Sequence, residues 1–159
     1  MPYRIKILSM KNYDLSQYMI RHGEILIFPI TKEEIGILKS GKENFSKHLG
    51  IPYITAPHNI DVLNFIENKT NMENDYWFMD TLWMVVHTKT KEIFGTLRYE
   101  KDGEYNKIIK NLTMILEYPE SYEDCVNLFA KFLDVNNYRN IVVENDLLVD
   151  IHDEIKGMI

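Results

Sequence analysis

The sequence is poor in the residues that crosslink proteins or bind metals. Cys125 is the only cysteine, so no internal disulfide can form within the chain. A single thiol also cannot complete a zinc cluster, and the five histidines are scattered without metal-ligand spacing. We therefore expect no metal site, and a protein of a reducing compartment.

Long apolar runs and an excess of positive charge are also missing. No segment approaches the about 20 apolar residues of a membrane span, and Arg4 and Lys6 interrupt the region where a signal peptide would be apolar. Eighteen Lys and Arg residues against 24 Asp and Glu residues give a net charge of −6. We expect a cytoplasmic protein that binds neither nucleic acid nor a membrane.

What is present is typical of a globular domain. The 159 residues are 45% hydrophobic and 26% charged, which predicts one domain over 1–159 with a sizeable core. The order of strand and helix patterns predicts an α/β or α+β fold with a mixed sheet. Outside the central unit, strands are expected at 3–8, 24–30, 83–87, 93–99 and 107–117. Helices are expected from the Thr31–Glu34 capping box to Gly41, and at 42–49, 59–68 and 147–155.

The stretch 112–144 reads as strand, helix and strand, and the rest of the chain is organised around it. A short apolar run predicts a strand at 113–117, which Pro119 ends because proline has no N–H for a ladder. A second apolar run predicts a buried strand at 139–144. Short joins imply a right-handed crossover and parallel strands, so any ligand is expected near 116–124.

The helix of this unit has recognisable ends. We expect the Ser121 hydroxyl to cap its first turn, with Asp124 completing a variant of the capping box, and Asn136-Asn137 to stop it. Cys125 lies in the first turn, where a packed small hydrophobe is the better interpretation than a reactive thiolate. The aromatic residues before and within the next hairpin either line a groove or pack in the core; they are Tyr76, Trp77, Phe78 and Trp83.

The pattern resembles the GNAT superfamily of acyl-CoA-dependent N-acyltransferases, and within it the branch of ribosomal-protein-alanine acetyltransferases. The resemblance is carried by LIFPITKEEIGILKSGKENFSKHLGI at 26–51, by LWMVVHTKTKEIFGTLRYE at 82–100, and by 112–144. It implies a mixed, mostly antiparallel sheet flanked by helices, shortened at the C-terminus. It also implies that acetyl-CoA lies in a splay between the strands at 113–117 and 140–144.

One motif of the family is degenerate here. The family's phosphate loop reads Q/R-x-x-G-x-G/A, and its glycines let backbone N–H groups approach the CoA pyrophosphate. The matching positions 118–124 hold neither glycine nor a basic residue. Carboxylates stand nearby instead, at Glu117, Glu120, Glu123 and Asp124. In a first turn, acids also have a structural role because they complement the helix dipole.

The resemblance places candidate site residues around this loop. Glu117 is the candidate general base, against the alternative of a solvated acid at a strand end. His152 is the candidate proton donor to the thiolate, against a partly exposed surface histidine. The candidate acetyl-CoA contacts are the backbone of Ile115, Leu116 and Glu117, and the residues Ser121 and Tyr122.

Two functions fit this reading. The first is an N-acetyltransferase that moves an acetyl group from acetyl-CoA to the amine of a small molecule or peptide. The second is a catalytically inactive GNAT-fold module that has lost CoA binding and serves binding or interaction, because a fold alone does not grant activity. Either function is compatible with a homodimer.

Overall fold

The computed structural model describes residues 19–52, 59–113 and 117–146. Within these ranges one mixed six-stranded sheet is flanked by helices, so the predicted α+β class is confirmed. The strands are β1 (Ile20–His22), β2 (Ile25–Pro29), β3 (Leu82–His87), β4 (Glu92–Asp102), β5 (Tyr105–Leu112) and β6 (Ile141–Asn145). The helices are α1 (Lys32–Ser40), α2 (Lys42–Leu49), α3 (Ile60–Lys69), the short 3₁₀-helix η1 (Trp77–Asp80) and α4 (Ser121–Val135). The strand expected at 3–8 and the helix expected at 147–155 lie outside the described residues.

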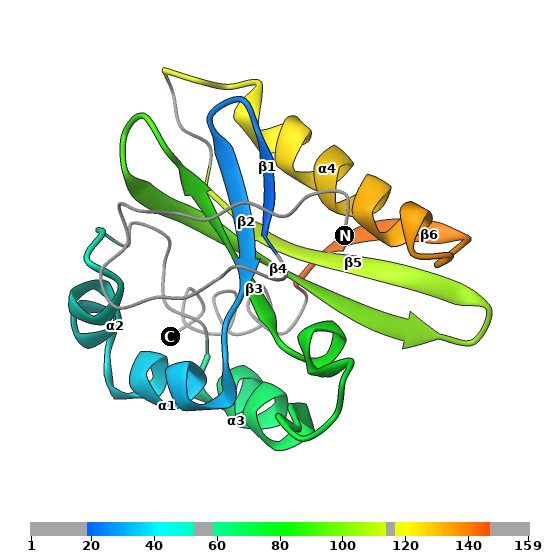
Figure 1. Cartoon of the computed structure of the whole chain (residues 1–159), viewed down its shortest axis with the longest axis horizontal. Coiled ribbons are helices and arrows are strands. Elements are labelled where there is room, and N and C mark those ends of the chain that lie inside the picture. The colour runs from blue at the N-terminus through cyan, green and yellow to red at the C-terminus, as the bar shows by residue number, and fades with distance from the viewer. Residues whose placement is uncertain (1–18, 53–58, 114–116, 147–159) are drawn as a thin grey trace, which may run out of the picture.

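The strands follow chain order across the sheet, from β1 to β6 (Figure 1). Every neighbouring pair from β1 to β5 is antiparallel. β6 is parallel to β5, and α4 makes the crossover between them. The sequence-based prediction of an antiparallel meander followed by a parallel strand is therefore confirmed.

Local capping signals place the helices that cover the first half of the sheet. The Glu34 N–H donates to the Thr31 hydroxyl at 3.2 Å, and the Thr31 N–H donates to the Glu34 carboxylate at 2.9 Å, which is the expected capping box. Gly41 has a φ of +141° and separates α1 from α2. The Asn59 side chain accepts the Asp61 N–H at 2.7 Å and caps α3.

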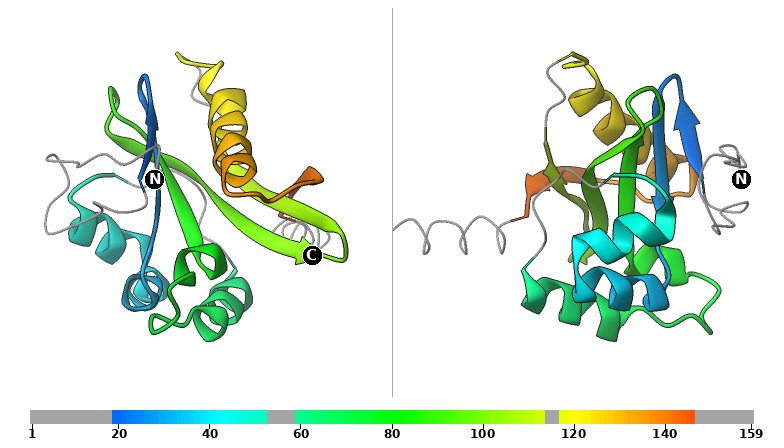
Figure 2. Two further views of the ribbon diagram at one scale, coloured as in Figure 1. Left: turned by 45° about the vertical axis from the view of Figure 1, so that its right-hand side comes forward. Right: turned by 90° about the vertical axis from the view of Figure 1, so that its left-hand side faces the viewer.

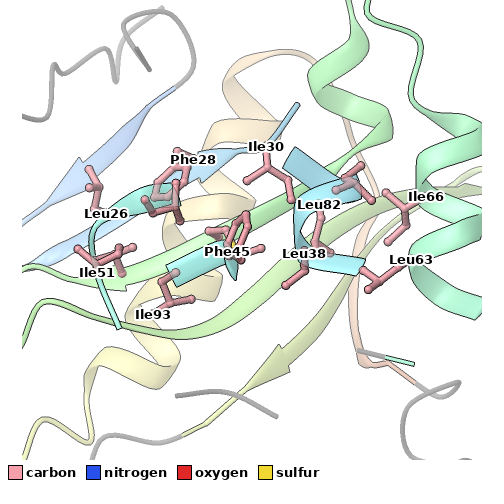
Figure 3. Close-up of a cluster of buried hydrophobic side chains, with 14 of the residues drawn as sticks. Leu26, Phe28, Ile30, Leu38, Phe45, Ile51, Leu63, Ile66, Leu82 and Ile93 are labelled. Carbon is pink, nitrogen blue, oxygen red and sulfur yellow. The ribbon is translucent and has the colours of Figure 1, made fainter. Parts of the chain in front are cut away.

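The sheet separates two hydrophobic clusters, because alternate residues of a strand face opposite sides. One cluster lies under α1, α2 and α3, and Figure 3 shows Phe45 of α2 within it, among Leu26 and Phe28 of β2. The other lies under α4 and holds Trp83 of β3 with Phe129 of α4. Figure 2 shows α4 on one side of the sheet and α1 to α3 on the other.

The predicted strand at 113–117 is wrong at both of its described ends. β5 ends at Leu112, Thr113 lies outside the strand, and Glu117 is an exposed turn residue. The partner strand explains the early end. The β3–β4 register shifts between Val85, which pairs with Gly95, and Val86, which pairs with Ile93. The β4–β5 pairing ends beside this bulge, at Gly95 and Leu112.

The predicted cap of α4 is also wrong. Glu120 occupies the N-cap position with helical backbone angles, φ −65° and ψ −24°, and no side chain caps the helix. Ser121 therefore lies inside the first turn and is buried. The predicted stop is confirmed, since Asn136 is the C-cap and Asn137 has a φ of +70°.

The apolar run of β6 is more exposed than the sequence predicts. Val142 and Val143 are 37% and 41% exposed. β6 is the last strand in the described sheet, so one of its edges has no neighbour among the described strands. Ile60, the first residue of α3, is also half-exposed.

Candidate functional site

The candidate site lies at the end of the described β5–β6 ladder. Their pairing runs from Asn106 opposite Ile141 to Lys110 opposite Asn145. One further hydrogen bond, from the Asp146 N–H to the Lys110 carbonyl at 2.9 Å, is the last between the two strands among the described residues. β5 nevertheless continues to Leu112.

The direction of the amides shows what faces this opening. The Asn106 N–H donates toward β6, to the Asn140 carbonyl at 3.0 Å, and the Thr113 N–H donates toward β4, to the Phe94 carbonyl at 2.8 Å. Amide groups alternate between the two edges of a strand. The N–H of Leu112 therefore points to the β6 side, beyond the last described hydrogen bond between the two strands.

A lysine stands beside the first turn of α4. Lys110 Nζ donates to the Tyr122 hydroxyl at 3.0 Å and lies 4.7 Å from the centre of the Tyr122 ring. Lys107, on the same strand, is engaged by two acids. Lys107 Nζ is 3.0 Å from Asp102 and 3.5 Å from Glu144.

The structure brings only some of the predicted site residues together. Tyr122 is half-buried against Lys110, and Ser121 is buried directly before it. Glu117 lies exposed in the turn, so the premise that it sits within the strand is wrong, while its role stays a prediction. Ile115, Leu116 and His152 lie outside the described residues.

The acids around α4 face solvent. Exposed carboxylates stand in the turn and the first turn of the helix, at Glu117, Glu120, Glu123 and Asp124. Their repulsion toward a bound phosphate is weakened by water and salt, since exposed charges are screened within about 10 Å at ordinary ionic strength. The arrangement therefore disfavours an anion at this helix start.

A second polar group lies on the sheet face opposite α4. Arg98 of β4 is only 7% exposed, and its Nη1 donates to the Glu100 carboxylate at 2.9 Å. Its Nη2 lies 3.7 Å from Asp146 Oδ1, and Asp146 is 3% exposed. Sequence reasoning missed this pair, because only the register between β4, β5 and β6 brings it together.

Cys125 is a packed core residue, as expected. Its side chain is fully buried under α4, and Sγ donates to the Tyr122 carbonyl at 3.1 Å. Burial raises the pKa of the Cys125 thiol to about 12, and nearby Asp124 adds to the rise. The thiol stays protonated at neutral pH and takes no part in nucleophilic chemistry.

We expect Cys125 to resist thiol reagents in the folded protein. At pH 8, reaction with a chromogenic disulfide should be on the order of 1000-fold slower than in urea, because the thiolate is the reactive form. A Cys125→Ala variant gives the background rate. Equal rates for folded and unfolded protein would contradict the burial of this thiol.

Other features add no candidate chemistry. No described helix combines the length and apolar character needed to cross a membrane. Within the described ranges, no cluster of His, Cys, Asp and Glu has a metal-binding arrangement. A surface hollow of about 540 Å³ lies along α2 and the loop after it; it is lined by Lys42, Glu43, Ser46, Lys47, Gly50, Ile51 and Pro52.

The described residues form a mixed α+β domain with one parallel strand pair, β5 and β6. No protein-family model and no curated protein matches the chain. Several solved structures, however, are similar to this chain. A GNAT-family acetyltransferase from Bacillus anthracis is 12% identical with a TM-score of 0.44, over 79% of this chain and 72% of that one.

Two further structures are similar to the same degree. The ribosomal-protein-S5-alanine acetyltransferase from Vibrio fischeri is 10% identical with a TM-score of 0.45, over 80% of this chain and 73% of that one. A GCN5-related N-acetyltransferase from Brucella melitensis is 12% identical with a TM-score of 0.44, over 82% of this chain and 60% of that one. These values describe a distant likeness in chain path.

Proposed function

We propose that the protein is a GNAT-type N-acyltransferase that moves an acetyl group from acetyl-CoA to the amine of a small molecule or peptide. The observation that carries the proposal is the end of the β5–β6 ladder at Lys110 and Asp146, with β5 running on to Leu112. A parallel pair that parts beside a helix start offers backbone donors to a ligand.

The backbone of β5 supplies the contact that such a reaction needs. In this proposal the Leu112 N–H, which points to the β6 side, binds an amide carbonyl of the pantetheine arm. A donor held rigidly in a strand stabilises developing negative charge on a carbonyl oxygen without reorganising. Acetyl-CoA itself brings the activated thioester, and the chain's task is to orient it and to handle the proton of the amine.

CoA phosphates bound near the start of α4 would meet one basic and several acidic side chains. Lys110 favours an anion near the start of α4. The helix start itself adds little, because the N–H groups of Ser121, Tyr122 and Asp124 already donate to the carbonyls of Tyr118, Pro119 and Glu120. The exposed acids nearby oppose an anion. The residues present therefore fit acetyl-CoA as a weakly held substrate.

We expect acetyl-CoA to bind with a dissociation constant no better than roughly the millimolar range. Lys110→Met should weaken binding a further few-fold, because one partly exposed charge contributes less than about 1 kcal/mol. Lys107→Met is the matched control on the same strand, and it should change nothing since Asp102 and Glu144 already engage that ammonium. Titration calorimetry measures all three, and micromolar binding by the wild type would contradict the expectation.

The second candidate is a GNAT-fold module without catalysis. The exposed acids and the absence of glycine at 118–124 favour it. A panel of small amines and peptides incubated with acetyl-CoA and read by mass spectrometry separates the two functions. An acetylated product supports the transferase. No product, together with no binding of acetyl-CoA, would support the module.

A further inference from the structure

The surface hollow along α2 has a volume of about 540 Å³, which is within the range of small-molecule pockets. It lies on the side of the sheet away from α4. Phe45 of α2 and Ile51 just after that helix both belong to the hydrophobic cluster on this side (Figure 3). Lys110 instead contacts Tyr122 of α4, so the hollow and the candidate acetyl-CoA site are on opposite sides of the sheet.

The loop that forms one wall of the hollow is apolar and held in place. Ile51 is 6% exposed, and Pro52 follows it. The Pro52 carbonyl accepts the Ile93 N–H of β4 at 2.9 Å. The N–H groups of Gly50 and Ile51 donate to the Ser46 carbonyl at 2.7 and 3.2 Å. The donors of this wall are therefore satisfied, and the polar contacts open to a ligand come from side chains.

Two lysines of α2 line the hollow without a partner. Neither Lys42 nor Lys47 makes an ion pair or a side-chain hydrogen bond with a described residue. The same holds for the hydroxyl of Ser46, which also lines the hollow. Lysine stems extend an apolar surface while their ammonium groups stay in water. Ammonium groups at the rim of an apolar hollow suit an anion that carries an apolar body.

Glu43 is the only acid among the lining residues that the structure describes, and it is turned away from Lys47. Residues four apart are neighbours on a helix, so a Glu43–Lys47 pair is within reach of the sequence. The Glu43 carboxylate lies instead toward the start of α2, where its Oε2 is 3.8 Å from the position of a Cβ added to Gly41. An acid there complements the helix dipole, and Lys47 is left for a ligand.

We propose that this hollow binds a small monocarboxylate with an apolar body, such as an aryl or alkyl acid. Two lysines against one glutamate leave a single positive charge in excess, on a chain with a net charge of −6. A carboxylate matches that excess, whereas a phosphate ester with nearly two negative charges exceeds it. The Ser46 hydroxyl donates to the carboxylate, and the apolar body covers Ile51 and Pro52. The proposal concerns binding rather than catalysis, and it is independent of acetyl transfer.

An NMR titration of the isotope-labelled full chain with naphthoate tests the proposal. We expect chemical-shift changes centred on 42–52 and a dissociation constant in roughly the millimolar range, as the size of this probe allows. Naphthalenemethanol lacks the charge and acetate lacks the apolar body, so each should bind several-fold more weakly. Naphthyl phosphate should bind no more tightly than naphthoate. These comparisons use the wild type alone, so they do not depend on the folding of any variant.

Variants of the lining residues locate the site. Lys42→Met and Lys47→Met should each weaken naphthoate binding by about 2- to 5-fold, because each removes one partly or fully exposed charge. Glu43→Gln should strengthen binding by a similar factor. Lys32→Met is the matched control, because Lys32 is an exposed lysine at the start of α1 that does not line the hollow.

Four results would each overturn the proposal. They are the absence of shift changes at 42–52 with naphthoate at several millimolar, equal binding of naphthalenemethanol, tighter binding of naphthyl phosphate, and an equal loss of affinity in Lys32→Met and the two lining variants. Circular dichroism checks that each variant is folded; lysine and methionine have similar helix propensities, so the helices should be kept.

Discussion

Trp83→Ala is expected to lower the free energy of unfolding by about 3–5 kcal/mol, the range for deleting a large aromatic side chain from a core. Trp83 is fully buried, and its ring centre lies 5.1 Å from that of Phe129 and 5.3 Å from that of Phe132. Its Nε1 donates to the Phe78 carbonyl at 2.8 Å. One side chain thus joins the sheet, α4 and η1.

Urea unfolding followed by circular dichroism measures this effect. Trp83→Phe keeps an aromatic ring but removes the donor to the Phe78 carbonyl, and it should cost about 1–3 kcal/mol. Trp77→Ala is the control, because Trp77 is only partly buried at the margin of the same cluster, and its loss should be smaller. Equal losses at Trp77 and Trp83 would contradict the packing described here.

Gly95→Ala is expected to destabilise the protein by about 1–3 kcal/mol through overpacking. A Cβ at this position would lie 2.7 Å from the Asn111 carbonyl oxygen and 2.8 Å from Leu112 Cα. Both atoms belong to the β5 backbone, which cannot move aside as a flexible side chain would. The clash falls at the end of β5, beside the opening toward β6, so acetyl-CoA binding should weaken as well.

The sign of this effect distinguishes the clash from ordinary propensity. An unobstructed glycine in a strand or helix interior is destabilising by roughly 0.5–1 kcal/mol relative to alanine, so replacement without a clash would stabilise. Gly36→Ala in α1 is the matched control, because its added Cβ meets only the Glu67 carboxylate, at 3.5 Å. We expect urea unfolding to show a gain for Gly36→Ala and a loss for Gly95→Ala; a gain for both would contradict the close approach of β4 and β5.

Signals that act within a few residues were predictable from the sequence. The Thr31–Glu34 capping box, the left-handed Asn137 and the hairpin of β3 and β4 each depend on local backbone preference or on alternation. The crossover from β5 through α4 to β6 followed from short joins.

Features set by distant partners were not predictable. The end of β5 depends on a bulge in β4, and the exposure of Val142 depends on β6 being the last described strand. Glu120 displaced Ser121 as N-cap, although both positions precede the same apolar face. The burial of Asp146 beside Arg98 had no local signal in the sequence, because it depends on the register of β4, β5 and β6.

The central claim is that acetyl-CoA binds where β5 and β6 part. A crystal structure of the protein soaked in acetyl-CoA at several millimolar tests it most directly. The account predicts the pantetheine arm between the two strands, with a hydrogen bond from the Leu112 N–H and the phosphates toward Lys110 and the first turn of α4. Acetyl-CoA bound elsewhere on the molecule, or absent from well-ordered crystals whose β5–β6 opening is accessible to solvent, would contradict it.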